Sequence, residues 1–340
     1  MFLSISVRCL MNVEALNSVE TVGNLSRHRT VPMVIPQRDG YTLKYVPAVS
    51  GESIAHGYQA LLVDVAKSLS LPVGEFSSRY EFIKFSEDSY LKVEGVEPPK
   101  SYDDIRRFEV DVLLKDVVAD VGGFLYTGDI PVKRTSRFQV GYMIPAIQDV
   151  LDATAMEAEF HVRYLFSQAE EGAALGQIPY NVEIASSVYT LNLNIDLAGI
   201  GVPSSSFGGA PKGARDELKK KEQELRESIP RRRRAALIAL LKLLANNSFG
   251  GKRSRFLPNS ELRSCAFALA DDAFTVSPGN YTDYVQRTWA RAQKYSALTG
   301  HAVKVWCVNK EGLNVPDGVS KRETIEDIFE DIMKLTLEGR

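Results

Sequence analysis

The run of residues at 182–196 contains no glycine or proline, and its apolar and polar side chains partly alternate. Alternation with a period of two is typical of a strand that buries one of its faces. Residues 2–10 alternate in the same way and predict a first strand. The sequence therefore predicts a fold that contains a sheet, and helical patterns elsewhere make the expected class α+β.

Helical and strand patterns follow one another along the rest of the chain. The segment Ser50 to Ser53 introduces a helix that runs to about Ser70, with its apolar side chains on one face. Near the C-terminus, a capping-box pattern at Ser320 to Glu323 precedes a final amphipathic helix. Further strands are expected at 138–145, 263–269 and 302–308, and a further helix at 283–298.

Long segments separate these elements. Residues 11–46 contain many asparagines, glycines and prolines and are expected to be mostly loop. Helices are predicted at 214–229 and from Pro230 to about Ala245, because proline suits the first turn of a helix. We therefore expect residues 1–340 to form a single ferredoxin-like α+β core with three insertions. These are an acidic surface insertion at 80–130, with short strands expected within 80–120, a hairpin at 157–181, and a glycine-rich linker, helices and basic loop at 199–258.

Charge is unevenly distributed along the chain. The formal net charge is only −2, so the total does not indicate a nucleic-acid partner. Residues 81–129 nevertheless carry twelve acidic and six basic side chains, whereas residues 204–256 carry fourteen basic and five acidic ones. This distribution allows a basic groove on an otherwise neutral body.

Cysteine usage and hydropathy favour a cytoplasmic protein. The three cysteines, Cys9, Cys265 and Cys307, lie in apolar strand-like runs and lack metal-ligand spacing, so we expect them to be reduced and buried. The alternating N-terminus lacks the apolar core of a signal peptide. No window of eighteen apolar residues predicts a membrane span.

The sequence carries no recognisable motif for catalysis, metal binding or a cofactor. The sequence contains neither a G-x-x-x-x-G-K-[ST] loop nor an H-E-x-x-H motif, and its four histidines do not pair at helical metal-binding spacing. Adjacent carboxylates occur at Asp103-Asp104 and Asp271-Asp272, but neighbouring residues do not share a face of a strand or helix. We therefore expect a non-catalytic protein with no metal and no cofactor.

Basic residues instead cluster in three polar, turn-forming segments. These are Asn24–Arg29, Pro131–Arg137 and Gly250–Pro258. Lysine and arginine supply positive charge, serine and threonine supply hydroxyl groups, and glycine lets backbone N–H groups approach a phosphate. The runs Arg231–Arg234 and Lys219–Lys221 are interpreted as solvated or partner-facing helix surfaces.

These segments carry a family resemblance. Residues Leu10–Asn17, followed by Gly23–Arg29, resemble the N-terminal signature of the DevR family, the CRISPR-associated backbone subunit of type I interference complexes. Residues Pro47–Gly57, Val132–Arg137 and Gly250–Pro258 are similar to later blocks of that family, in the same order. The details resemble the archaeal type I-A subgroup.

The resemblance implies a fold and a set of partners. It implies a crescent-shaped protein with a modified RNA-recognition-motif (RRM) palm, inserted subdomains and a thumb-like hairpin at 157–181. It also implies that many copies stack as a helical filament along one CRISPR guide RNA (crRNA) and present it to target DNA. Further implied partners within the Cascade complex are a repeat-handle-binding subunit, a small subunit and a helicase–nuclease. Because strand 4–10 lacks the usual aromatic pair, we expect contacts to the RNA backbone rather than to particular bases.

Two other functions remain open from the sequence. One is a metal-dependent ribonuclease that processes repeat RNA, and the other is a DNA-binding regulator. For RNA binding, the first candidates are the basic residues and His28 of the three clusters, with neighbouring polar side chains and His161 as further donors. The complete candidate set is Asn17, Arg27, His28, Arg29, Ser50, Ser53, Lys133, Arg134, Ser136, Arg137, His161, Lys252, Arg253, Ser254 and Arg255.

Overall fold

The central element of the fold is a long strand at the N-terminus. The computed structural model describes residues 1–165, 176–204 and 215–338. Strand β1 (Phe2–Glu14) lies between β11 (Gly176–Asp196) and β12 (Asn259–Ala270), antiparallel to both. Strand β13 (Val303–Asn309) extends the sheet beyond β12, and β8 (Phe138–Val140) pairs with β11. The predicted α+β class is confirmed.

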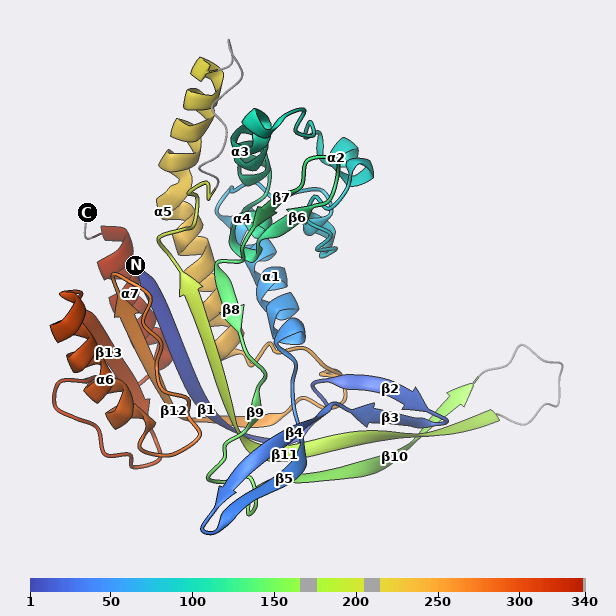
Figure 1. Cartoon of the computed structure of the whole chain (residues 1–340). Coiled ribbons are helices and arrows are strands. Elements are labelled where there is room, and N and C mark those ends of the chain that lie inside the picture. The colour runs from blue at the N-terminus through green and yellow to red at the C-terminus, as the bar shows by residue number, and fades with distance from the viewer. Residues whose placement is uncertain (166–175, 205–214, 339–340) are drawn as a thin grey trace.

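Helices cover both faces of this sheet (Figure 1). Helices α1 (Gly51–Ser68), α5 (Arg215–Ala245) and α7 (Ile325–Met333) share one large apolar core with the inward side chains of β1, β11 and β12. Helix α6 (Tyr284–Thr299) packs with the alternate side chains of β12 and β13. The cysteines of β1, β12 and β13 are free and buried, as predicted.

The segment 11–46 is not mostly loop, as the sequence suggested, but forms two hairpins. The first is β2 (Ser18–Val22) with β3 (Leu25–His28), and the second is β4 (Thr30–Gln37) with β5 (Gly40–Pro47). Gly23 and Gly40 take positive φ angles of 61° and 133° at the two turns. The residues that suggested loop therefore mark the turns, while the strands between them pair normally.

The segment 80–130 is mainly helical, although residues 80–120 were expected to contain short strands. It contains α2 (Asp88–Glu94), α3 (Ile105–Lys115) and α4 (Val117–Gly122), with a short 3₁₀ turn at Tyr102–Asp104. Another 3₁₀ turn, Ser77–Arg79, directly precedes the segment. Strands β6 (Phe124–Tyr126) and β7 (Val132–Arg134) form a small separate hairpin beside it. This region has its own apolar cluster, to which Leu225 of α5 also belongs, so α5 joins it to the sheet.

Helix α5 is continuous, although two helices were predicted with Pro230 at the start of the second. Proline normally breaks a helix because it lacks an N–H group and crowds the preceding turn. Here both halves are held by packing. Leu225 lies in the apolar cluster of the helical segment 80–130, which we call the helical region. Leu237 and Leu240 lie in the core that packs against the sheet. Tertiary contacts on each side of Pro230 therefore outweigh the local preference of the sequence.

The C-terminal helix also starts later than expected. Its capping box is formed by Thr324 and Asp327, whose side chains each accept a hydrogen bond from the other's backbone N–H. The predicted cap at Ser320 lies instead in the short strand β14 (Ser320–Lys321), which pairs with β13. Among the described residues, every helix is too short or too polar to span a lipid bilayer.

A long two-stranded arm leaves the sheet on one side (Figure 1). It consists of β10 (Ala155–Leu165) and the first part of β11, paired without a break from Ala155–Ser186 to Leu165–Gly176. The hairpin predicted at 157–181 thus has strands at both ends, while residues 166–175 lie outside the described part. Partway along the arm, β3 pairs in parallel with β11 at Asn181 and Val182, and the short strand β9 (Ile144–Pro145) pairs with β11 nearer its C-terminal end.

Candidate nucleic-acid interface

Two of the three basic segments, together with the start of α1, meet at the end of β1. The backbone N–H of Lys252 donates to the Ala15 carbonyl at 3.1 Å, and the Lys252 Nζ donates to Ser26 Oγ at 2.6 Å. At the start of α1, the Ser53 hydroxyl donates to the Phe249 carbonyl at 3.0 Å. Segments separated by some 200 residues in sequence are therefore joined into one surface by direct hydrogen bonds.

Asn17 connects the first basic segment to α1. Its side-chain oxygen accepts from Arg29 Nε at 2.7 Å and from the backbone N–H of Ser50 at 3.1 Å. Ser50 is the N-cap of α1, and its hydroxyl accepts from the backbone N–H of Ser53. The arrangement places a guanidinium group beside a helix N-terminus, and both favour a negatively charged ligand.

The basic loop after α5 keeps its positive charge uncompensated. Arg253 donates to the Asn246 carbonyl at 2.9 Å and to Ser248 Oγ at 3.3 Å, and Arg255 donates to the Tyr180 hydroxyl. With Lys252 on Ser26, all three cations bind neutral acceptors. None of the three pairs with a carboxylate in the parts of the chain that the structure covers. Their charge remains available to a phosphate.

Gly251 allows this loop to approach the end of β1. Its φ is +89°, and a Cβ placed on it would lie 2.4 Å from the Leu16 Cα atom. A side chain at this position would push the loop away from Ala15, to which Lys252 is hydrogen-bonded. The glycine is therefore required for close backbone contact, as the sequence pattern suggested.

A group of rings and cations extends the surface onto the arm, and sequence reasoning found only part of it. His161 stacks on Tyr180 with ring centroids 5.3 Å apart and contacts the edge of Phe256. The guanidinium groups of Arg163 and Arg255 lie 5.6 Å and 5.8 Å from the Tyr180 ring. The period of two places Arg163 on the same face as His161, but only the register of β10 with β11 brings Tyr180 opposite His161.

His28 is removed from the candidate RNA contacts because it is buried. Its Nε2 lies 2.9 Å from the Glu14 carboxylate, and its Nδ1 lies 2.8 Å from the Arg29 carbonyl oxygen. Both neighbours are acceptors, so the ring donates from both nitrogens and is positively charged. Glu14 also accepts from the Tyr189 hydroxyl at 2.6 Å and the Leu16 N–H at 2.7 Å. These hydrogen bonds join the end of β1, at Glu14, to the end of β3, at His28, beneath the candidate interface.

The His28–Glu14 pair predicts a pH dependence of stability. Burial alone would lower the pKa of His28, but the hydrogen bond and charge of Glu14 outweigh it and raise the pKa. A raised pKa in the folded state stabilises the protein fully below the unfolded value of about 6.5 and less as the pH rises through the folded pKa.

We therefore expect the melting temperature of the protein to fall relative to that of a His28→Gln variant as the pH is raised above about 6.5. Thermal unfolding followed by circular dichroism across pH 6 to 9 measures this difference. Parallel curves for the two proteins would mean that His28 does not carry the expected charge in the folded state.

The remaining arginines of the first two segments are paired with acids. Arg27 is half-exposed and lies 3.4 Å from Glu20 and 3.9 Å from Glu183. Arg137 lies 3.1 Å from Asp196. These pairs reduce the positive charge that Arg27 and Arg137 can offer to RNA. Three other candidates remain in these segments and in the basic loop. Lys133 and Ser254 are exposed. The Ser136 hydroxyl donates to the Phe138 carbonyl.

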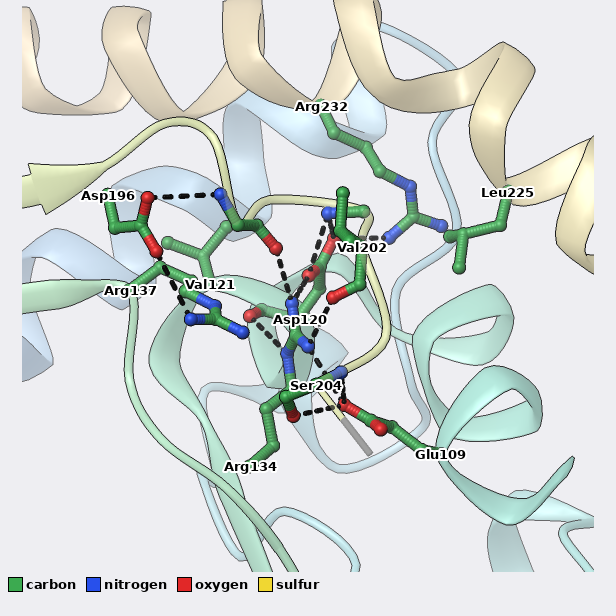
Figure 2. A network of polar contacts seen from close by, with 12 residues as sticks. Glu109, Asp120, Val121, Arg134, Arg137, Asp196, Val202, Ser204, Leu225 and Arg232 are labelled. Carbon is green, nitrogen blue, oxygen red and sulfur yellow. Dashed lines mark hydrogen bonds and ion pairs between the residues drawn. The ribbon is translucent and has the colours of Figure 1, made fainter. Parts of the chain in front are cut away.

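Arg134 is fully buried in a network of charges, shown in Figure 2, and is removed from the candidate set. Its guanidinium group contacts Glu109 at 3.0 Å and the Asp120 side chain, and it donates to three backbone carbonyls, including that of Asp120. Arg232 of α5 reaches the same Asp120 carboxylate at 2.9 Å. The run Arg231–Arg234 thus lies inside α5, and the prediction of a purely solvated or partner-facing surface is wrong for Arg232.

The network explains why the 131–137 segment does not join the other two. Asp120 comes from α4, Glu109 from α3, Arg134 from β7 and Arg232 from α5. With two arginines and two acids it is neutral overall, and its backbone bonds to Gly199 and Val202 bring in the loop after β11. It holds the helical region against α5 and has no part in the candidate interface. Among the described residues, no group of three or more histidine, cysteine or acidic side chains could hold a metal ion.

The fold and the site together define an α+β protein with a basic, hydrogen-bonding surface of the kind that contacts nucleic-acid backbones. Residues 5–289 match the model of the CRISPR-associated negative auto-regulator DevR/Csa2 family. The chain belongs to this family. The resemblance stated from the sequence is confirmed.

Two curated relatives agree with this assignment, and a solved structure shares the fold. The chain is 47% identical to the CRISPR-associated aCascade subunit Cas7/Csa2 2 of Saccharolobus solfataricus over 95% of this chain and 97% of the relative. It is 35% identical to the CRISPR-associated protein Cas7/Csa2 1 of the same organism, over 93% and 96%. Its fold is similar to that of a chain in a CRISPR RNA-guided surveillance complex, pre-nicking, with a TM-score of 0.52, 11% identity, and coverage of 99% and 100%.

Proposed function

We propose that this chain is a non-catalytic backbone subunit that binds crRNA in a type I CRISPR interference complex of the archaeal type I-A kind. Several copies bind side by side along one guide RNA and present it for pairing with target DNA. The other partners are a repeat-handle-binding subunit, a small subunit and a helicase–nuclease, and the place of action is the cytoplasm. The 47% identity to a Cascade subunit over nearly the whole length supports this proposal.

The palm of the proposed subunit is RRM-like, and the protein is crescent-shaped. The strand order β12–β1–β11–β8, with α1 between β1 and β8 and α5 between β11 and β12, supports a ferredoxin-like core. The segments 80–130, 157–181 and 199–258 are insertions in it. Residues 205–214 of the last insertion lie outside the described part. We assign the thumb to the arm formed by β10 and β11.

One observation carries the proposed function: Arg29, Lys252, Arg253 and Arg255, at the end of β1, have no acidic partner among the described residues, whereas His28 and the other arginines of the candidate set do. Arg29 binds Asn17, and Lys252, Arg253 and Arg255 bind neutral oxygens. Backbone N–H groups and hydroxyls of the α1 start lie beside them. These groups recognise phosphate and ribose without reading bases, as a subunit that must hold any guide sequence requires.

The direct test is a binding titration with single-stranded RNA at several salt concentrations. We expect affinity to be nearly the same for an RNA and its scrambled sequence, and to fall with salt with a log–log slope of about −0.7 per phosphate neutralised. A flat salt dependence, or a strong preference for one sequence, would overturn backbone recognition.

The two alternative functions are tested in the same preparation. The family description names a negative auto-regulator, which favours testing duplex DNA. We expect single-stranded RNA to bind more tightly than duplex DNA at equal salt, and the reverse order would support the regulator. Incubation with repeat RNA and a divalent metal should leave the RNA intact. Specific cleavage would support the ribonuclease.

A further inference from the structure

A cavity of about 250 Å³ lies between the sheet and the helices α5 and α7, and we call it the α5–α7 cavity. Side chains of three neighbouring strands form its floor. Val7 of β1 pairs with Leu191 of β11. Cys9 of β1 pairs with Tyr189 of β11 on one side and with Leu262 of β12 on the other. All five residues line the cavity, so its floor is the face of the sheet that α5 and α7 cover.

The walls of the cavity are apolar as well. They include Leu244 near the end of α5, Phe249 just after it, Ile325 at the start of α7, and Met143. Each of these four residues is more than nine-tenths buried. The Phe249 carbonyl also accepts a hydrogen bond from the Ser53 hydroxyl at the candidate interface, so the cavity borders the residues that lead into the basic loop.

An apolar space of this size favours an apolar ligand over water. The Tyr189 hydroxyl donates to Glu14 at 2.6 Å and already has its partner. A trapped water needs roughly two to four polar partners, and an unfilled void removes dispersion contacts from the side chains around it. Because an apolar cavity of about 150 Å³ holds a benzene molecule, the 250 Å³ of this one holds roughly ten non-hydrogen atoms.

The mouth of the cavity carries a cation. Lys310 directly follows β13, is exposed, and has no acid within ion-pair distance in the part of the chain that the structure covers. The start of α7 lies at the same mouth, and its capping box uses the backbone N–H groups of Thr324 and Asp327. The first N–H groups of a helix have no partner within the helix, so those of Ile325 and Glu326 are left over. The lysine and these N–H groups favour a negatively charged head group.

Glu326 carries the opposite charge among the described lining residues. Its side chain is exposed in the first turn of α7, where the helix dipole stabilises an acid. The other polar groups near the mouth are neutral, since the Asn247 amide donates to Ser260 Oγ at 2.6 Å. The charge of the ligand is therefore set by Lys310 and the helix N–H groups against Glu326, and each of these two side chains can be changed separately.

We propose that the α5–α7 cavity binds a small amphipathic anion. The apolar body of the ligand lies on the floor formed by β1, β11 and β12, and its carboxylate or similar head group meets Lys310 at the mouth. The inference goes beyond the proposed function and does not rest on it, because none of the residues that line the cavity belongs to the candidate RNA contacts.

Isothermal titration calorimetry of the full chain tests the proposal with three probes of equal chain length: octanoate, octanol and octylamine. Octanoate has about ten non-hydrogen atoms, which matches the cavity. We expect it to bind saturably with a dissociation constant below about 1 mM, which is within reach of a ligand of this size. Octanol should bind more weakly than octanoate, and octylamine most weakly. No saturable binding of octanoate, or tighter binding of octylamine, overturns the proposal.

Four variants test the place and the charge. Ala245, the last residue of α5, lines the cavity, and Ala245→Phe should fill it and weaken octanoate binding by at least about tenfold. Lys310→Gln should weaken binding by about threefold or more, and Glu326→Gln should strengthen it. The matched control is Lys304→Gln on β13, an exposed lysine that does not line the cavity and should leave binding unchanged. Circular dichroism checks that each variant folds.

The thiol of Cys9 locates the ligand without any substitution. Cys9 lines the cavity, whereas Cys265 and Cys307 are fully buried elsewhere in the sheet. Because burial raises the pKa of the Cys9 thiol to about 12, modification by a small disulfide reagent is followed at alkaline pH. We expect octanoate to slow the modification of Cys9, measured by mass spectrometry of the peptides. Octanoate binding that leaves Cys9 unprotected, or that survives Ala245→Phe at full strength, places the ligand elsewhere and overturns the proposal.

Discussion

Replacing Lys252, Arg253 and Arg255 together by alanine is expected to weaken the binding of single-stranded RNA by at least about tenfold. Each charged hydrogen bond to a phosphate contributes about 1.5–3 kcal/mol, so three losses exceed the 1.4 kcal/mol of a tenfold change even when they are far from additive. The three side chains bind only neutral partners, so their removal leaves no buried acid without its partner. Fluorescence anisotropy with labelled RNA measures the change.

The matched control is Lys219→Ala with Lys220→Ala on the exposed part of α5. Lys221 was part of the helix face expected to be solvated, but its ammonium group lies 2.9 Å from Asp111 and helps to hold α5 against α3, so it is left unchanged. We expect the control to alter RNA affinity by less than about threefold. An equal loss in both variants would show that general positive charge, and not the loop, accounts for binding.

Replacing Asp120 by asparagine is expected to destabilise the fold by about 3–5 kcal/mol, because the change leaves buried charges without their partner. Arg134 and Arg232 both donate hydrogen bonds to this carboxylate, and the backbone N–H of Gly201 donates to it as well. All three charged side chains are at most 1% exposed, so water cannot replace the lost contact. Urea unfolding of the full chain measures the free energy.

Glu330→Gln provides the comparison for this prediction. Glu330 forms an ion pair with Lys334 on the surface of the last helical turn, and both side chains are more than half exposed. Exposed pairs of this type contribute about 0–1 kcal/mol. If Asp120→Asn costs no more than Glu330→Gln, the buried network does not hold the helical region in place.

The core of the fold could be predicted from the sequence because its signals are local. Alternation in 2–10 and 182–196 marked the two central strands, and the Ser50 cap marked the start of α1. The hairpins at 18–47 were missed because their glycines, asparagines and prolines were interpreted as loop. Only pairing with a second strand distinguishes a turn between strands from an irregular segment.

The candidate site was only partly predictable, because burial of charge depends on contacts distant in sequence. Lys133 and Arg134 are neighbours in one basic segment, yet β7 turns the first outward and the second toward Asp120. His28 is likewise indistinguishable from its neighbours in the sequence, because only the fold brings Glu14 beside it. By contrast, the glycines before Lys252 correctly indicated a close backbone approach, which is a local property.

The central claim, that this chain holds guide RNA in a CRISPR complex, is tested most directly by purifying it from its native host and sequencing the nucleic acid that accompanies it. We expect single-stranded RNAs that carry spacer sequence next to repeat sequence, with many different spacers represented. Recovery of duplex DNA from one promoter region, or of RNA without enrichment of repeat and spacer sequences, would contradict it.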